Sequence, residues 1–145
     1  MSEPTLRPAV VRDAAALHEL LLKLAGEIPL AVGTLEQEEA LYAQLRKTLA
    51  FGESWVADDK GLIAGCVLVD NVQTGRHWGE NEVLELRYAA GEALDALLAK
   101  VLERRAPIAA TVRDANRSGL AERLVRLGFR EQEARLGERR FRREA

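Results

Sequence analysis

The stretch from Asn81 to Arg105 holds the residues whose types and spacing are best suited to chemistry, and that chemistry is phosphate binding. Its first part is short, rich in Val and Leu, and typical of a strand. Its second part predicts a helix with one buried face, formed by Leu94, Leu97, Leu98, Val101 and Leu102. A strand that runs straight into a helix offers an anion unpaired N–H groups and the positive end of the helix dipole. The function therefore depends on the turn at residues 89–94.

Other chemistries have weaker support in the sequence. With one Cys and two His, the chain can form no internal disulfide, and we expect no metal site. Cys66 stands in the middle of an apolar run, which predicts a buried, inert thiol. His18 lies beside an apolar helical face and is expected to be a surface or boundary residue. A polar loop at 71–80 carries Arg76, His77 and Trp78, a weak signal for ligand binding.

The bulk composition indicates one globular domain over residues 1–145. The chain is 48% hydrophobic and 30% charged, which is enough for a sizeable core. No apolar run is long enough to span a bilayer, and the N-terminus has no apolar signal core, so we expect a cytoplasmic protein. Residues 100–145 hold 13 Lys and Arg against 7 Asp and Glu, a net charge of +6. This basic third could attract an anionic ligand, or it could form solvated faces.

The elements that must position the turn follow from hydrophobic period and turn residues. Pro8 suits an edge strand, Asp13 stands at a helix N-cap, and Thr34 with Gln37 fits a capping box. Gly65 within a strand indicates a bulge or the close approach of another group. In chain order we predict a strand at 5–11, helices at 14–26 and 34–50, a hairpin at 55–69, the strand and helix of 81–105, a strand at 108–112, a helix at 119–127, and two last strands at 129–132 and 135–142. This order predicts a mixed α/β (α+β) single domain.

Three segments in this order resemble the GNAT superfamily of acyl-CoA-dependent N-acetyltransferases. Leu6 to Leu17 looks like the family's first strand and helix, and Ser54 to Val69 looks like its second and third strands. Thr111 to Phe129 resembles the strand–helix segment that ends in Leu-Gly-Phe. The resemblance covers nearly the whole chain. It implies a GNAT-like mixed sheet of six to seven strands flanked by about four helices.

The resemblance also implies a site for acetyl-CoA, between a fourth and a fifth strand that splay apart. The family's loop R/Q-x-x-G-x-G/A binds the pyrophosphate through backbone N–H groups at the start of the next helix. Aligned without gaps, this chain has Ala89 at the Arg/Gln position and Glu92 and Leu94 at the glycines. A shifted alignment places Tyr88, Gly91 and Ala93 at those positions. The first alignment loses both glycines, and the second keeps the small residues but shortens the approach loop. The sequence leaves both alignments open, and the loop is degenerate relative to the family pattern.

The expected site residues follow from the same resemblance. A general base on or near the fourth strand would be Glu85 or Glu82, although both also fit the solvent side of a half-buried strand. The family's tyrosine acid falls on Leu124, so that acid is missing. Asn116 matches an Asn common near the acyl-CoA site and is equally suited to forming a turn. The residues expected to bind the cofactor are Leu86, Tyr88, Ala89, Gly91, Glu92, Ala93 and Asn116.

Three functions remain open from the sequence. The first is acetyl-CoA-dependent acetylation of an amine by direct transfer, with a small-molecule or peptide amine as substrate. The second is a catalytically inactive GNAT-like domain that serves as a binding or interaction module. Nucleic-acid binding through Arg139, Arg140, Arg142 and Arg143 ranks last, because the overall charge is acidic and interleaved aromatics are missing. We expect no nucleic-acid or membrane partner and leave a homodimer open.

Overall fold

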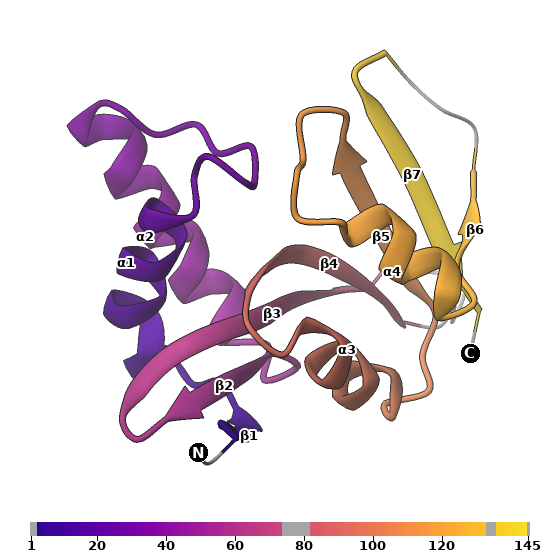
Figure 1. Cartoon of the computed structure of the whole chain (residues 1–145), viewed down its shortest axis with the longest axis horizontal. Helices are drawn as coiled ribbons and strands as arrows, with labels where there is room; N and C mark the ends of the chain where they lie inside the picture. The colour runs from indigo at the N-terminus through magenta and orange to yellow at the C-terminus, as the bar shows by residue number, and fades with distance from the viewer. Residues whose placement is uncertain (1–2, 74–81, 133–135, 145) are drawn as a thin grey trace.

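The strands of the chain form one mixed sheet in the order β1-β2-β3-β4-β5-β7-β6 (Figure 1). The computed structural model describes residues 3–73, 82–132 and 136–144. In chain order the elements are β1 (Thr5–Pro8), the 3-10 turn η1 (Val11–Asp13), α1 (Ala14–Lys23), α2 (Leu35–Leu49), β2 (Trp55–Asp59), β3 (Leu62–Gln73), β4 (Glu82–Gly91), α3 (Leu94–Leu102), β5 (Ile108–Arg113), α4 (Leu120–Arg126), β6 (Arg130–Glu131) and β7 (Glu138–Arg143). This α+β architecture, with seven strands and four α-helices in the described residues, confirms the predicted order.

The first strand and helix meet at a charged junction. β1 is an edge strand and ends at Pro8, earlier than predicted, because the chain turns into η1. Asp13 occupies the N-cap position of α1, but no helix N–H bonds to its side chain. Instead its carboxylate accepts hydrogen bonds at 2.9 Å from Val10 N and from both terminal nitrogens of Arg7. Arg7 also bonds to Asp58 of β2 at 2.9 Å, so these charges fix β1 and α1 to the sheet.

Helices α1 and α2 cover one face of the sheet. At the start of α2, Thr34 Oγ1 accepts a hydrogen bond from Gln37 N at 3.1 Å, which confirms the Thr34 half of the predicted capping box. The apolar faces of both helices pack on the central strands, and Figure 1 shows the pair together on the left. The buried residues of this layer are Ala9, Ala14, Leu17, Leu21, Ile28, Leu41, Leu45, Leu49, Val56, Cys66, Leu68 and Ala90.

The hairpin of β2 and β3 confirms two predictions from single residues. A bulge shifts the register between Ala57 and Asp58, next to the pair Ala57–Gly65. A Cβ on Gly65 would lie 2.8 Å from Glu92 N and closer still to its carbonyl oxygen, so the β4–α3 turn approaches Gly65 closely. Cys66 is fully buried, and burial raises the pKa of its thiol to about 12. The thiol is therefore inert at neutral pH.

Helices α3 and α4 pack on the opposite face. Four residues of the predicted apolar stripe of α3 are buried there, together with Leu124 of α4 and Phe141 of β7, and the fifth, Leu102, is partly buried. Leu124 is fully buried, so the position of the family's tyrosine acid lies inside the core. The buried residues of this layer are Ala57, Val67, Val69, Leu84, Leu86, Ala89, Leu94, Leu97, Leu98, Val101, Ala106, Ile108, Ala110, Val112, Leu120, Ala121, Leu124, Phe129 and Phe141.

Strands β4 and β5 are parallel and pair over only three residues, from Leu84–Ile108 to Leu86–Ala110. Beyond that point β4 continues to Gly91 along β3, and β5 continues to Arg113 along β7. The two strands therefore diverge. Figure 1 shows β5, β7 and α4 leaning away from β4 toward the right.

The ends of several elements differ from the predictions. α1 stops at Lys23, and the last strands are shorter and later, with β6 at Arg130–Glu131. Arg76, His77 and Trp78 lie outside the described residues, as does Asn81. Among the helices that the structure describes, none is long and apolar enough to cross a bilayer.

Candidate active site

The divergence of β4 and β5 opens a cleft with a volume of about 570 Å³. This volume lies within the range of small-molecule sites. The α1–α2 segment and α2 form one side of the cleft, and β5, β7 and the turn before α4 form the other. Its lining residues are Ile28, Pro29, Leu30, Ala31, Val32, Gln37, Ala40, Leu41, Gln44, Glu85, Leu86, Arg87, Tyr88, Ala89, Thr111, Arg113, Asn116, Leu120, Glu138 and Arg140.

A backbone contact bridges the two sides of the cleft. Arg117 N, in the turn after β5, donates a hydrogen bond to Glu27 O at 2.7 Å. Figure 1 shows the α1–α2 segment and the β5–α4 turn facing each other above β4. This bond joins two segments that are far apart in sequence, and it holds the α1–α2 segment over the cleft.

A β-bulge in β4 decides which side chains enter the cleft. In the backbone register, Tyr88 pairs with Leu68 and Leu86 pairs with Val69. Arg87 therefore has no backbone partner on β3. In a regular strand, residues three apart lie on opposite faces. The extra residue places Glu85 and Tyr88 on the same face, toward α1 and α2. The bulge therefore brings two polar groups of β4 together in the cleft.

Glu85 lies in a group of charged side chains. Arg87 Nε is 3.2 Å from Asp70 Oδ2, and Arg87 Nη1 is 3.8 Å from Glu85 Oε1. Asp70 is buried, with its Oδ1 lacking a hydrogen-bond partner among the described residues, whereas the Glu85 side chain is 40% exposed. Arg87 is thus held mainly by Asp70. Glu85 keeps a solvated carboxylate that faces the cleft and can accept a proton.

Tyr88 contributes a neutral phenol to the cleft. It packs against the α1–α2 layer, and burial raises the pKa of its hydroxyl. The phenol therefore keeps its proton at neutral pH and can donate a hydrogen bond. The sequence assigned Tyr88 to cofactor binding only, because the bulge that turns its side chain into the cleft has no signature in the sequence.

The turn between β4 and α3 has two residues in the left-handed region, Gly91 at φ 86° and Ala93 at φ 61°. Glu92 N bonds to Ala64 O at 2.9 Å, and the Glu92 side chain is exposed. Helix α3 starts at Leu94 with no side chain capping its N-terminus. Among the described residues, no side chain hydrogen-bonds to the N–H groups of its first turn.

The structure brings some of the predicted site residues together and separates others. Glu85, Leu86, Tyr88, Ala89 and Asn116 line the cleft. Gly91, Glu92 and Ala93 do not line it and lie at the start of α3. Glu82 begins β4, where its backbone pairs with Gln73, and its side chain lies outside the described part of the structure.

Asn116 has the turn-forming role that the sequence left open. Its Oδ1 accepts hydrogen bonds from Ser118 N at 2.9 Å and from Ser118 Oγ at 2.7 Å. The backbone N–H of Asn116 donates a hydrogen bond to Arg113 O at 2.9 Å. The side-chain oxygen is thus occupied within the turn, and the NH₂ group is the part of Asn116 that remains for a ligand.

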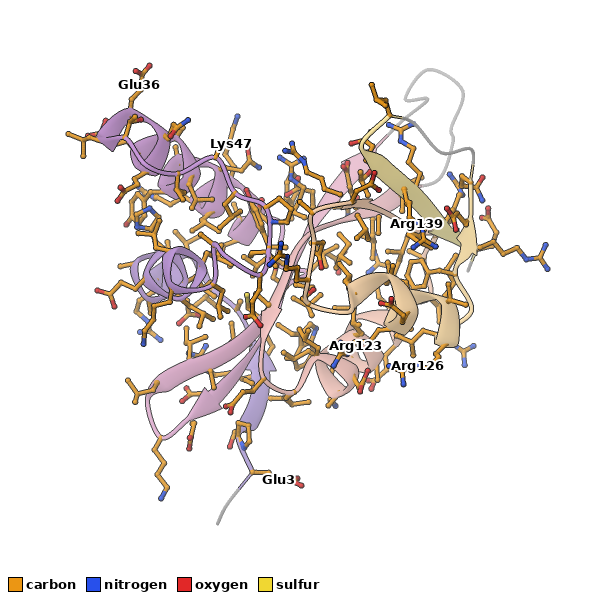
Figure 2. All side chains as sticks on the ribbon, turned by 45° about the horizontal axis from the view of Figure 1, so that its top comes forward. Glu3, Glu36, Lys47, Arg123, Arg126 and Arg139 are labelled. Carbon is orange, nitrogen blue, oxygen red and sulfur yellow. The ribbon has the colours of Figure 1, made fainter. Side chains whose placement is uncertain are left out.

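The sequence did not assign two groups of arginines to this site, although it offered Arg140 as a candidate for nucleic-acid binding. Arg123 and Arg126 of α4 lie beside the first turn of α3, where they approach Asp95 Oδ1 at 3.2 and 3.9 Å (Figure 2). Arg113 and Arg140 line the cleft from β5 and β7. The net positive charge of residues 100–145 was the signal for both groups, but it did not identify which arginines approach the site.

No protein-family model matches the chain, and no curated protein does either. Solved structures do match, over nearly the full length of both chains. An agmatine N-acetyltransferase variant is 12% identical, with a TM-score of 0.73, and the match covers 99% of this chain and 100% of the other. The PaiA N-acetyltransferase from Thermoplasma acidophilum, solved with coenzyme A, is 14% identical, with a TM-score of 0.66 and complete coverage of both chains. A GNAT-family acetyltransferase from Streptococcus pneumoniae is 19% identical, with a TM-score of 0.62, covering 96% and 98%.

These likenesses show that the chain has the fold of the GNAT N-acetyltransferases. At such identities they establish the fold and leave the activity to be argued from the site.

Proposed function

We propose that this chain, which has the GNAT fold, is an acetyl-CoA-dependent N-acetyltransferase that transfers the acetyl group directly to an amine. The observation that carries the proposal is the divergence of β4 from β5 after Leu86 and Ala110. It opens a cleft of substrate size and leaves one edge of β4 without a strand partner among the described residues. An amine acceptor is supported by the similar agmatine N-acetyltransferase.

The free edge of β4 fits the extended arm of a CoA thioester. Beyond Leu86 its backbone N–H and C=O groups can pair with an extended amide-bearing ligand, much as an added strand would. Ala89 presents only a methyl group at this edge of the cleft, which leaves room for the ligand. A backbone N–H on the same edge would polarise the thioester carbonyl.

The start of α3 fits the pyrophosphate. Its first turn has no capping side chain, and Arg123 and Arg126 bring positive charge beside it. Gly91 and Ala93 adopt the left-handed conformation that favours glycine, and α3 starts directly after them. These conformations support the shifted alignment, in which Gly91 is the first glycine and Ala93 is the last small residue.

Glu85 is the base in this proposal. The amine nitrogen bonds to the acetyl carbon, the carbon–sulfur bond breaks, and the amine proton goes to the Glu85 carboxylate, directly or through water. CoA leaves as a thiolate. Tyr88, whose phenol is protonated at neutral pH, can donate a hydrogen bond to that sulfur from the same face of β4.

The test is product formation from acetyl-CoA and a mixture of primary amines. Release of the CoA thiol, with a matching gain of one acetyl group on an amine by mass spectrometry, is the expected result. Thiol release without an acetylated amine would indicate hydrolysis and would contradict the proposal, as would no release at millimolar acetyl-CoA.

The alternative is a GNAT-fold domain that binds partners without catalysis. Two carboxylates favour it. Glu92 lies exposed in the β4–α3 turn, and Asp95 in the first turn of α3 already pairs with Arg123. Both would repel a pyrophosphate. The alternative predicts no measurable affinity for acetyl-CoA.

A further inference from the structure

The cleft carries opposite charges on two of its walls, one formed by β4 and the other by β5 and β7. On the β4 wall, Arg87 is paired with Asp70 at 3.2 Å, and Glu85 adds a further, solvated carboxylate. The excess charge of this wall is negative. On the other wall, Arg113 and Arg140 extend from neighbouring strands, with Glu138 as the acidic residue among them. The excess charge there is positive.

The arginines of the second wall are placed by the register of β5 and β7. Thr111 pairs with Arg140, and Arg113 pairs with Glu138. These positions alternate along the strands with Val112, Phe141 and other core residues. The side chains of Arg113 and Arg140 therefore lie on the face of the sheet opposite that core layer, toward the cleft. Arg113 and Arg140 occupy diagonal cross-strand positions, which are within reach of long side chains.

Both arginines are available to a ligand. Arg113 and Arg140 are exposed, and no ion pair or side-chain hydrogen bond in the described parts of the chain involves either guanidinium. Glu138 lies directly opposite Arg113 in the register but is not within ion-pair distance of it. Each guanidinium presents paired N–H donors in a planar fork, which is the geometry that binds a carboxylate through two hydrogen bonds.

We infer that the acceptor is an amino carboxylate: a small molecule with its amine at Glu85 and its carboxylate at Arg113 and Arg140. The inference rests on the proposed function and adds the substrate class to it. An acceptor with only positive charges would place a cation against the two arginines, and this costs affinity. The volume of about 570 Å³, part of which the acetyl end of the cofactor must occupy, favours a small acceptor over a protein tail.

The test compares acceptors that differ only in the carboxylate. α- and ω-amino acids, their carboxamides and an alkyl diamine are assayed at a fixed acetyl-CoA concentration. The expected kcat/KM is about tenfold or more higher for the carboxylate than for the matched carboxamide, since a charge-assisted hydrogen bond supplies such a factor. The α-amino acids test a short distance between amine and carboxylate, and the ω-amino acids test longer distances.

Two variants locate the effect. Arg113→Gln and Arg140→Gln are each expected to raise KM for the amino carboxylate about tenfold, with kcat and the carboxamide values little changed. Arg130→Gln, an exposed arginine of β6 outside the cleft, is the matched control and should change neither. Equal use of carboxylate and carboxamide by the unmodified chain would overturn the inference. So would a preference that persists in the double variant.

Binding separates this inference from the proposed function. Titration calorimetry of the same pairs measures affinity without turnover. Tighter binding of the carboxylate than of the carboxamide, lost in Arg140→Gln, supports the amino-carboxylate site. If such binding is found but no acceptor is acetylated, the transferase proposal alone fails. If the diamine and the carboxamide are acetylated and a carboxylate does not raise kcat/KM, the transferase proposal stands and the amino-carboxylate inference is wrong.

Discussion

Glu85 owes its place in the cleft to one unpaired residue of β4. Because Arg87 is the bulge, Glu85 and Tyr88 share a face, and Asp70 holds Arg87 so that the Glu85 carboxylate remains solvated. Glu85→Gln keeps the size of the side chain and removes its basicity. We expect kcat to fall by about 10²- to 10⁴-fold, the usual range for a general base, with the Kd for acetyl-CoA unchanged. Steady-state kinetics and calorimetry on the same preparation give both numbers.

The control for this change is Glu36→Gln. Glu36 is exposed in the first turn of α2, does not line the cleft, and points outward from the end of the helix in Figure 2. It should leave kcat within about twofold, because its charge is solvated. A Glu85→Gln enzyme with unchanged kcat and an unchanged pH profile would show that the carboxylate does not take the proton.

Single residues were predictable from sequence where one local property decided their role. The apolar run around Cys66 predicts burial, and Gly65 predicts a close approach; both are confirmed. Residues whose role depends on backbone torsion were not predictable. Gly91 and Ala93 have positive φ, but the sequence alone could not choose between the two loop alignments. The same holds for Tyr88, whose side chain is turned by a bulge that β-propensity does not encode.

At the scale of elements, the close contact between β3 and the β4–α3 turn is the main constraint on the site. Gly65→Ala would place a Cβ against the Glu92 backbone, at 2.8 Å from its nitrogen, and the turn would have to move. We expect a loss of about 1–3 kcal/mol in unfolding free energy, as for other overpacked positions. Thermal unfolding should register this as a lower midpoint, by about 2–4 °C per kcal/mol.

Gly26→Ala is the matched control, because a Cβ there meets no atom within 4 Å. It should leave the midpoint unchanged or slightly raised. If Gly65→Ala were as stable as Gly26→Ala, the turn would not be held against β3, and its role in shaping the start of α3 would have to be abandoned.

The junction of β1, α1 and β2 predicts a dependence of stability on pH. The hydrogen bond from Arg7, together with that from Val10 N, holds the pKa of Asp13 below its usual value of about 3.9. A lowered folded-state pKa means that the stabilisation is present above that usual value and is lost as pH falls below it. Asp13→Asn should lose about 1–3 kcal/mol at pH 7 and show a flatter decline below about pH 4.

Denaturant unfolding at pH 7, 5, 4 and 3 measures this difference. Asp59→Asn, at an exposed carboxylate of β2 with no ion pair in the described structure, should follow the original chain at every pH. If the free energy of unfolding fell in parallel with pH for the original chain and Asp13→Asn, Asp13 would not contribute to the pH dependence of stability.

Element order was predictable because periodicity, caps and turn residues are local. Thr34 with Gln37 begins α2 as predicted, and the apolar stripe of α3 is buried as predicted. The residues at which elements end were less predictable. The strand predicted to continue past Pro8 gives way to η1, where Arg7 and Asp13 form an ion pair that no propensity anticipates.

At the scale of the whole molecule, the resemblance to the GNAT fold is confirmed, and its central feature is the divergence of two parallel strands. That feature comes from long-range pairing: β4 stays with β3 and β5 stays with β7. No local pattern in either strand specifies it, so the sequence indicated the cleft only through the resemblance. The charges on the two walls became visible only with the register of β5 and β7, and a homodimer stays a prediction.

The central claim is that the β4–β5 cleft and the start of α3 bind acetyl-CoA. Thermal unfolding with and without acetyl-CoA, and with free CoA as a second ligand, tests it most directly. At one hundred times its Kd, a ligand adds about 2.7 kcal/mol to the stability of the folded chain, which should raise the midpoint by several degrees. The account predicts this shift for both ligands. An unchanged midpoint at millimolar acetyl-CoA would contradict it and leave a GNAT fold that serves another purpose.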